Sequence, residues 1–122
     1  MITDVEKVIR EYIAEVIHLS LATSENNKPW VCELHFSYDK DLNLYFRSKQ
    51  FTRHSRELRE NPYVAGNIIQ QFNKNEKPRG VYFEGRCEEL VDVNNSHPAF
   101  ISLKERRSEE HTSELQSLTN LV

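Results

Sequence analysis

The N-terminal segment, residues 3–16, repeats its apolar side chains at the spacing of a helix. Thr3 is followed three residues later by Glu6, which is the arrangement of a capping box at a helix start. The apolar positions then recur every three or four residues, as on one face of a helix: Val5, Val8, Ile9, Tyr12, Ile13 and Val16. The pattern predicts a helix with one buried face.

From His18 the period changes to two, which is typical of strands that bury one face. Leu19, Leu21 and Thr23 share one side, and the polar residues 26–29 supply turn chemistry. Residues 30–38 alternate apolar and polar side chains, and after a polar turn residues 42–46 do so again. We predict a hairpin that continues into a three-stranded antiparallel meander.

The second half of the chain predicts two further helices and two further strands. Residues 52–60 favour a short helix that ends before Pro62, because proline disfavours the helical conformation of the residue preceding it. Residues 64–72 and 80–91 have the composition of strands, and residues 99–106 begin another helix. This order predicts a mainly β (α+β) antiparallel barrel with flanking helices. Only five strands are counted, so we expect a C-terminally truncated barrel that lacks its sixth strand.

Composition narrows the class of protein further. A chain of 122 residues can enclose one core, and no apolar run approaches the roughly 20 residues of a membrane span. Charged residues interrupt the start of the chain, so we expect no secretory signal and a cytoplasmic location. Cys32 and Cys87 lie far apart, which predicts neither a disulfide framework nor a metal site. A net charge of -3 gives no reason to expect a nucleic acid partner.

The last residues, 107–122, break with the preceding pattern. Their sequence, RSEEHTSELQSLTNLV, resembles the translation of a common sequencing adapter. We therefore expect a native domain in residues 1–106 and a non-native tail in residues 107–122. An ordinary polar, partly helical tail is the alternative.

The segment from Arg47 to Arg56 is the best candidate for a binding site. It leads from a strand end into a helix start and places Arg53, His54 and Arg56 in the first helical turn. Cations there cost about 0.3–1 kcal/mol each, because the helix N-terminus is itself partly positive. A phosphate would offset that cost. The helix N–H groups, the hydroxyls of Ser48 and Thr52 and the cations of Lys49 and Arg53 could hold it. A solvated basic face paired with nearby glutamates is equally compatible with the sequence.

Residues 22–66, from ATSENNKPW to PYVAG, resemble the first half of the pyridoxamine-phosphate-oxidase-like proteins, the FMN-binding split barrels. The resemblance extends over about residues 18–92, and the motifs TRH, VAG and RGVYFEG are similar to an uncharacterised bacterial branch of that superfamily. It implies an antiparallel split β-barrel, FMN as cofactor and a homodimer with its flavin sites at the subunit interface.

Carried over by position, the resemblance also implies which residues contact FMN. Arg47 and Ser48 would lie beside the ribityl phosphate with Lys49, and Thr52, Arg53 and His54 would form the phosphate clamp. The strand from Val31 to Phe36 would face the isoalloxazine ring, chiefly through three residues: Cys32, Glu33 and Leu34. Two positions depart from the family. His54 stands where many relatives have lysine, and Gly80 replaces the glutamine of the oxidases, which argues against oxidation of pyridoxamine phosphate itself.

These features lead us to expect an FMN-binding oxidoreductase that acts on a small-molecule substrate. Two alternatives stay open: a non-catalytic module that binds haem or a deazaflavin, with His35 as a candidate haem ligand, and a structural dimer without cofactor. Enzymatic activity is therefore not assigned, and the sequence identifies neither catalytic residues nor metal ligands.

Overall fold

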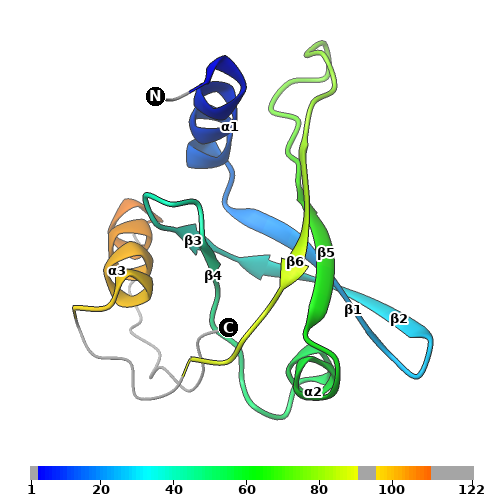
Figure 1. Ribbon diagram of the computed structural model, residues 1–122. Helices are drawn as coiled ribbons and strands as arrows, with labels where there is room; N and C mark the ends of the chain where they lie inside the picture. Colours follow the sequence, from blue (N-terminus) through cyan, green and yellow to red (C-terminus); the bar gives the residue numbers. More distant parts are fainter. Residues whose placement is uncertain (1–2, 91–95, 111–122) are drawn as a thin grey trace.

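The computed structural model describes residues 3–90 and 96–110, which form three helices and six strands (Figure 1). In chain order these elements are α1 (Asp4–Glu15), β1 (His18–Glu25), β2 (Lys28–His35), β3 (Ser37–Tyr38), β4 (Leu44–Tyr45), α2 (Arg53–Glu60), β5 (Tyr63–Ile68), β6 (Val81–Arg86) and α3 (Pro98–Glu110). The expected α+β organisation is confirmed. The tail predicted for residues 107–122 overlaps the end of α3 as far as residue 110 and otherwise lies outside the described residues.

The main sheet has four antiparallel strands in the order β2-β1-β5-β6. β1 and β2 form the predicted hairpin, with Glu25 opposite Lys28 and a two-residue turn at Asn26 and Asn27. Both turn residues have positive φ, 52° and 63°, which suits the twist of a tight hairpin and which asparagine tolerates. α2 packs against β1, and α3 lies beside β3 in a separate part of the fold (Figure 1).

The predicted three-stranded meander forms only in part. β1 pairs with β2 and, along its other edge, with β5. Residues 37–38 at the end of the predicted second strand pair with residues 44–45, but this second pairing, β3 with β4, makes a small separate sheet. The reason lies at Phe36 and Ser37, which are consecutive and both buried, so the alternation of β2 breaks there. The chain then leaves the main sheet, and residues 3–90 and 96–110 contain no closed barrel.

The core forms where α1 meets the inner face of the sheet. Ten apolar residues in the described chain are buried: Tyr12, Ile13, Val16, Leu19, Leu21, Phe36, Phe46, Leu58, Ile68 and Ala99. The helical spacing of α1 predicted the buried positions correctly only in its second half, at Tyr12, Ile13 and Val16, whereas the alternation of β1 did so at Leu19, Leu21 and Thr23. Val5 and Val8, at the start of the same helical stripe, are instead 68% and 56% exposed.

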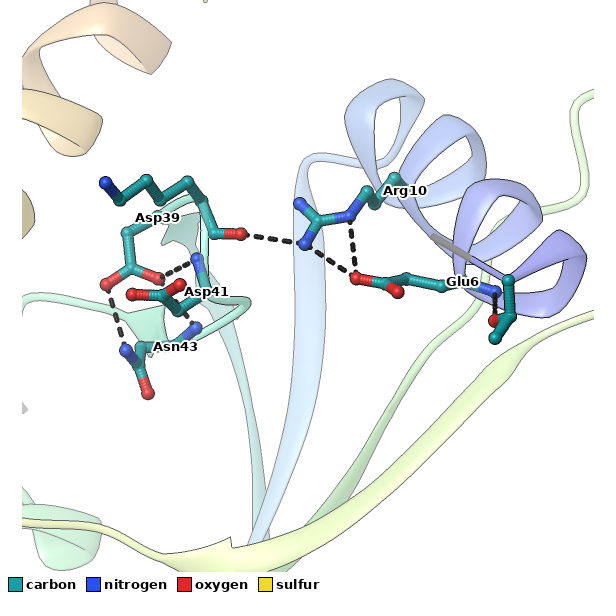
Figure 2. A network of polar contacts seen from close by, with 7 residues as sticks. Glu6, Arg10, Asp39, Asp41 and Asn43 are labelled. Atoms are coloured by element: carbon teal, nitrogen blue, oxygen red, sulfur yellow. Dashed lines mark hydrogen bonds and ion pairs between the residues drawn. The ribbon is translucent and has the colours of Figure 1, made fainter. Parts of the chain in front are cut away.

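α1 is also tied to the turn between β3 and β4 (Figure 2). The Arg10 guanidinium donates to Glu6 Oε1 at 2.9 Å and to the Lys40 carbonyl at 2.7 Å. In the turn itself the Asp39 carboxylate accepts hydrogen bonds from the backbone N–H groups of Asp41 and Asn43. Partial burial alone would raise the pKa of Asp39, but these bonds, together with those from the Asn43 side-chain amide and the Tyr45 hydroxyl, favour the ionised form and lower the pKa.

α3 returns to the end of α1 through Arg106. Its guanidinium donates to the carbonyls of Ala14 and Val16, and it lies over the ring of Phe36 at 4.9 Å. α1 has no basic residue in its last turn, so Arg106 supplies positive charge at that helix C-terminus. A buried hydrogen bond of 2.9 Å between Ser37 and Ser102 links α3 to β3 as well.

In the described part of the chain no helix combines the length and apolar character needed to cross a membrane.

Candidate functional site

The N-terminus of α2 forms as the sequence predicts. Thr52 is the N-cap residue, and its hydroxyl oxygen accepts a hydrogen bond from the backbone N–H of Ser55 at 3.4 Å. The helix ends at Glu60, before Asn61 and Pro62. The N–H groups of Arg53 and His54 precede the first helical hydrogen bonds, so this end of α2 retains donors and a partial positive charge.

Ser48, Thr52 and His54 form a polar cluster at this turn, in which Ser48 and His54 are buried and Thr52 is half-buried. The His54 Nε2 atom lies 2.6 Å from the Ser48 hydroxyl oxygen and 3.3 Å from the Thr52 hydroxyl oxygen. His54 is 9% exposed and its ring meets that of Phe46 edge to face, with 6.3 Å between centroids. Burial lowers the pKa of His54, and the nearby charge of Glu57 opposes that shift. The imidazole is therefore neutral at pH 7.

The same turn also holds Arg53. Its Nε donates to Glu57 Oε2 at 2.9 Å, and its guanidinium lies over the ring of Trp30 at 4.1 Å. The second oxygen of Glu57 accepts from the Thr23 hydroxyl at 2.7 Å. Both hydrogen bonds favour the ionised carboxylate, so they lower the pKa of Glu57. A fixed carboxylate thus anchors α2 to the hairpin and holds the Arg53 side chain.

A cavity of about 630 Å³ lies between α2 and the turn of the β1–β2 hairpin. Its lining is almost entirely charged or polar: Glu25, Asn26, Lys28, Arg53, Arg56, Glu57, Arg59 and Glu60. Four of these residues are cationic and three are anionic, so the lining has a small excess of positive charge. The cavity is large enough for part of a polar ligand.

The predicted ring-binding residues of β2 divide between the two faces of the sheet. Cys32 and Leu34 are half-buried against the core, whereas Glu33 is exposed and accepts a hydrogen bond from the Ser20 hydroxyl. Burial, with the neighbouring charges of Glu33 and Glu57, raises the pKa of Cys32 to about 11. Cys32 is therefore a protonated thiol at neutral pH.

The structure brings together only part of the predicted clamp. Ser48, Thr52 and His54 meet, but the Arg53 guanidinium contacts Glu57 and Trp30 instead. Lys49 is exposed, with its ammonium 5.9 Å from the centroid of the Phe51 ring, and Arg47 is half-buried.

Sequence reasoning missed the partners of Arg53. The alternation of residues 30–38 does not show that Trp30 is 40% exposed and covered by the guanidinium. The alternative of a solvated basic face paired with nearby glutamates did not anticipate a buried Glu57. Two signals were available: Glu57 follows Arg53 by four residues, and Thr23 is a polar residue on the inward face of β1.

Two histidines form a separate pair on the outward face of the sheet. His18 and His35 are opposite each other in β1 and β2, with ring centroids 4.4 Å apart. Within residues 3–90 and 96–110, no group of three or more histidine, cysteine or acidic side chains could hold a metal ion. The pair therefore lacks the third protein ligand of a conventional metal site.

Comparison with known proteins gives sequence relatives of limited coverage. No family model matches the chain. It is 31% identical over 88 residues to a UPF0306 protein of Pasteurella multocida, a match that covers 71% of this chain. The chain spans 59% of the length of the curated relatives that it matches.

Solved structures match a larger share of the chain. HutZ, the haem storage protein of Vibrio cholerae, superposes with a TM-score of 0.69 at 19% identity, over 98% of this chain and 88% of that protein. An FAD-binding protein of Mesorhizobium loti gives a TM-score of 0.63 at 20% identity, over 88% of this chain and 80% of that protein. A NimC/NimA family protein of Clostridium acetobutylicum gives a TM-score of 0.63 at 19% identity, over 94% of this chain and 76% of that protein. At these identities the matches establish a shared fold.

Proposed function

We propose that this chain, which has the split-barrel fold of the pyridoxamine-phosphate-oxidase-like proteins, binds FMN with its phosphate at the N-terminus of α2. The observation that carries the proposal is the meeting of Ser48, Thr52 and His54 at that helix end, with Arg53 on the same turn. Hydroxyl and backbone N–H donors at a helix N-terminus suit a phosphate dianion. The FAD-binding protein of Mesorhizobium loti adds support, because it shows that this fold can hold a flavin.

The remaining parts of the flavin site are proposed from the resemblance. The isoalloxazine ring would lie along β2 at Cys32, Glu33 and Leu34, and Arg47 and Lys49 would flank the ribityl phosphate. The flavin would supply the hydride or electron transfer, while the protein binds and orients it. We propose a cytoplasmic homodimeric oxidoreductase with a small-molecule substrate. Three large side chains on the main sheet are more than 60% exposed and would be available to a second subunit: Val31, Tyr63 and Tyr82.

An FMN titration followed by flavin fluorescence tests this proposal. Saturable quenching is expected for the wild-type chain, and Arg53→Ala should raise the Kd by about ten- to a hundredfold, the value of a charge-assisted hydrogen bond. Arg10→Ala is the matched control, since it removes an arginine from α1 rather than from α2. Absence of saturable binding would reject the flavin function, and an unchanged Kd in Arg53→Ala would place the phosphate elsewhere.

Haem binding is a second candidate, and the pair of His18 and His35 favours it. A histidine nitrogen is a common axial ligand of haem iron, and HutZ is a haem storage protein with this fold. Addition of haemin should then produce a shifted Soret band that is lost in His35→Ala. A chain that binds neither haemin, FMN nor a deazaflavin would be a structural dimer without cofactor.

A further inference from the structure

The Arg53 guanidinium is already engaged by two groups that are not part of the proposed phosphate site. Its Nε donates to Glu57, four residues further along α2, at 2.9 Å, and its central carbon lies over the Trp30 ring at 4.1 Å. The charge of Arg53 is therefore paired with a carboxylate on its own helix, and the contacts of Ser48 and His54 do not include it.

The groups that hold Arg53 are themselves fixed. The Glu57 side chain is 5% exposed, and Thr23 on β1 donates to its other oxygen at 2.7 Å. Trp30 stands on β2, and its ring lies 4.1 Å from the guanidinium carbon. The Arg53 side chain, by contrast, is 41% exposed and lines the polar cavity between α2 and the hairpin. Arg53 is therefore the member of this group with room to move.

A phosphate and Glu57 are both anions that accept hydrogen bonds from a guanidinium. Arg53 is the first residue of α2, and helical side chains lean toward the helix N-terminus. A rotamer change could therefore bring its charge to that helix end. We infer that Glu57 competes with the flavin phosphate for Arg53, so that binding requires Arg53 to leave Glu57 and Trp30. Glu57 is then a positioning residue that lowers the affinity of the site. The inference rests on the proposed function of the α2 N-terminus.

Glu57→Gln is the informative variant. A glutamine carbonyl can still accept from the Thr23 hydroxyl, but it no longer offers Arg53 a charge. We expect Glu57→Gln to bind FMN about two- to fivefold more tightly than the wild-type chain, because a partly exposed pair of this kind contributes on this scale. In an Arg53→Ala background the same substitution should give no gain. Loss of structure alone would weaken binding, so a gain that depends on Arg53 identifies competition.

Equal or weaker FMN binding by Glu57→Gln, with the wild-type chain binding FMN, would overturn the inference and leave the proposed function intact. Binding by neither protein would reject both. Trp30→Leu gives a second route if Glu57→Gln fails to fold, and it too should tighten binding, because it removes the other contact that holds Arg53.

Trp30 also provides a direct readout of Arg53, since it is the only tryptophan in the chain. Inorganic phosphate neither absorbs nor quenches in the tryptophan range. Its addition should change the Trp30 emission of the wild-type chain as the guanidinium leaves the ring, and it should leave the emission of Arg53→Ala unchanged. The same response in both proteins, or in neither, would contradict the release of Arg53.

Discussion

Tyr12→Phe should destabilise the fold measurably, although it removes a single oxygen atom. The Tyr12 ring is 3% exposed and lies 4.6 Å from the guanidinium carbon of Arg79, and phenylalanine keeps both contacts. The hydroxyl accepts a hydrogen bond from the Gln70 N–H at 2.8 Å. It donates its one proton to the carbonyl of Gln70 at 3.1 Å or of Arg79 at 3.3 Å. The variant therefore loses one accepted and one donated hydrogen bond.

At about 0.5–1.5 kcal/mol for each net hydrogen bond, the two losses amount to roughly 1–3 kcal/mol. The site is only partly buried, so water can reach the released backbone groups and we expect a value near the middle, about 2 kcal/mol. Urea unfolding of both proteins measures the difference. With a slope of about 1–3 kcal/mol per molar urea, the midpoint should fall by roughly 1 M while the slope stays constant.

Tyr63→Phe is the matched control for this experiment. Tyr63 is 66% exposed, and loss of its hydroxyl should change the free energy of unfolding by less than about 0.5 kcal/mol. If Tyr12→Phe were as stable as Tyr63→Phe, the hydroxyl of Tyr12 would not anchor the connection between β5 and β6 to α1, and the reasoning would be refuted.

Two further predictions concern titratable groups. Burial raises the pKa of Cys32 to about 11 and that of Cys87 to about 12. Both thiols should therefore react with iodoacetamide at pH 8 at least tenfold more slowly in the native protein than in urea, as measured by mass spectrometry. Equal reaction rates in the two conditions would contradict their burial. Burial lowers the pKa of His54 below its ordinary value of 6.5 in the native state. As the pH falls, His54 is therefore protonated in the unfolded chain before it is protonated in the native chain. The native state loses stability between pH 6.5 and the lowered pKa. Urea unfolding between pH 8 and 5 should therefore show a steeper loss in the wild-type chain than in His54→Gln, and parallel curves would argue against a neutral, buried His54.

The local elements could be predicted because their causes are local. The capping pair Thr3 and Glu6, the asparagines of the hairpin turn and Pro62 each act within a few residues, and the structure has a helix start, a turn and a helix end at those places. The three strands of the predicted meander do not form one sheet, because the predicted second strand breaks at Phe36 and Ser37, which are consecutive and both buried. Residues 37–38 still pair with residues 44–45, but in a separate sheet. The pairing of β1 with β5, for example Ala22 opposite Ala65, joins segments too far apart for a local pattern to reveal.

The candidate site shows the same division. The hydroxyls and cations of residues 47–56 were recognisable from the sequence, as was the helix that they begin. The orientation of Arg53 was not, because it depends on Trp30 on another element and on a carboxylate held by Thr23, 34 residues away from it. The sequence of one helical turn does not show that its neighbouring side chains contact different partners. Their grouping follows from the packing of α2 on the hairpin.

The contact of Arg106 with the end of α1 has a consequence for the order in which the chain can assemble. Arg106 and Ala14 are separated by 92 residues, so a ribosome releases α1 long before the side chain that neutralises its last carbonyls. During synthesis α1 must persist without this partner or form and dissolve repeatedly, since closing so large a loop is slow compared with forming a helix. α1 is made first but gains this contact late, because its last carbonyls receive their cationic partner only after α3 has been synthesised.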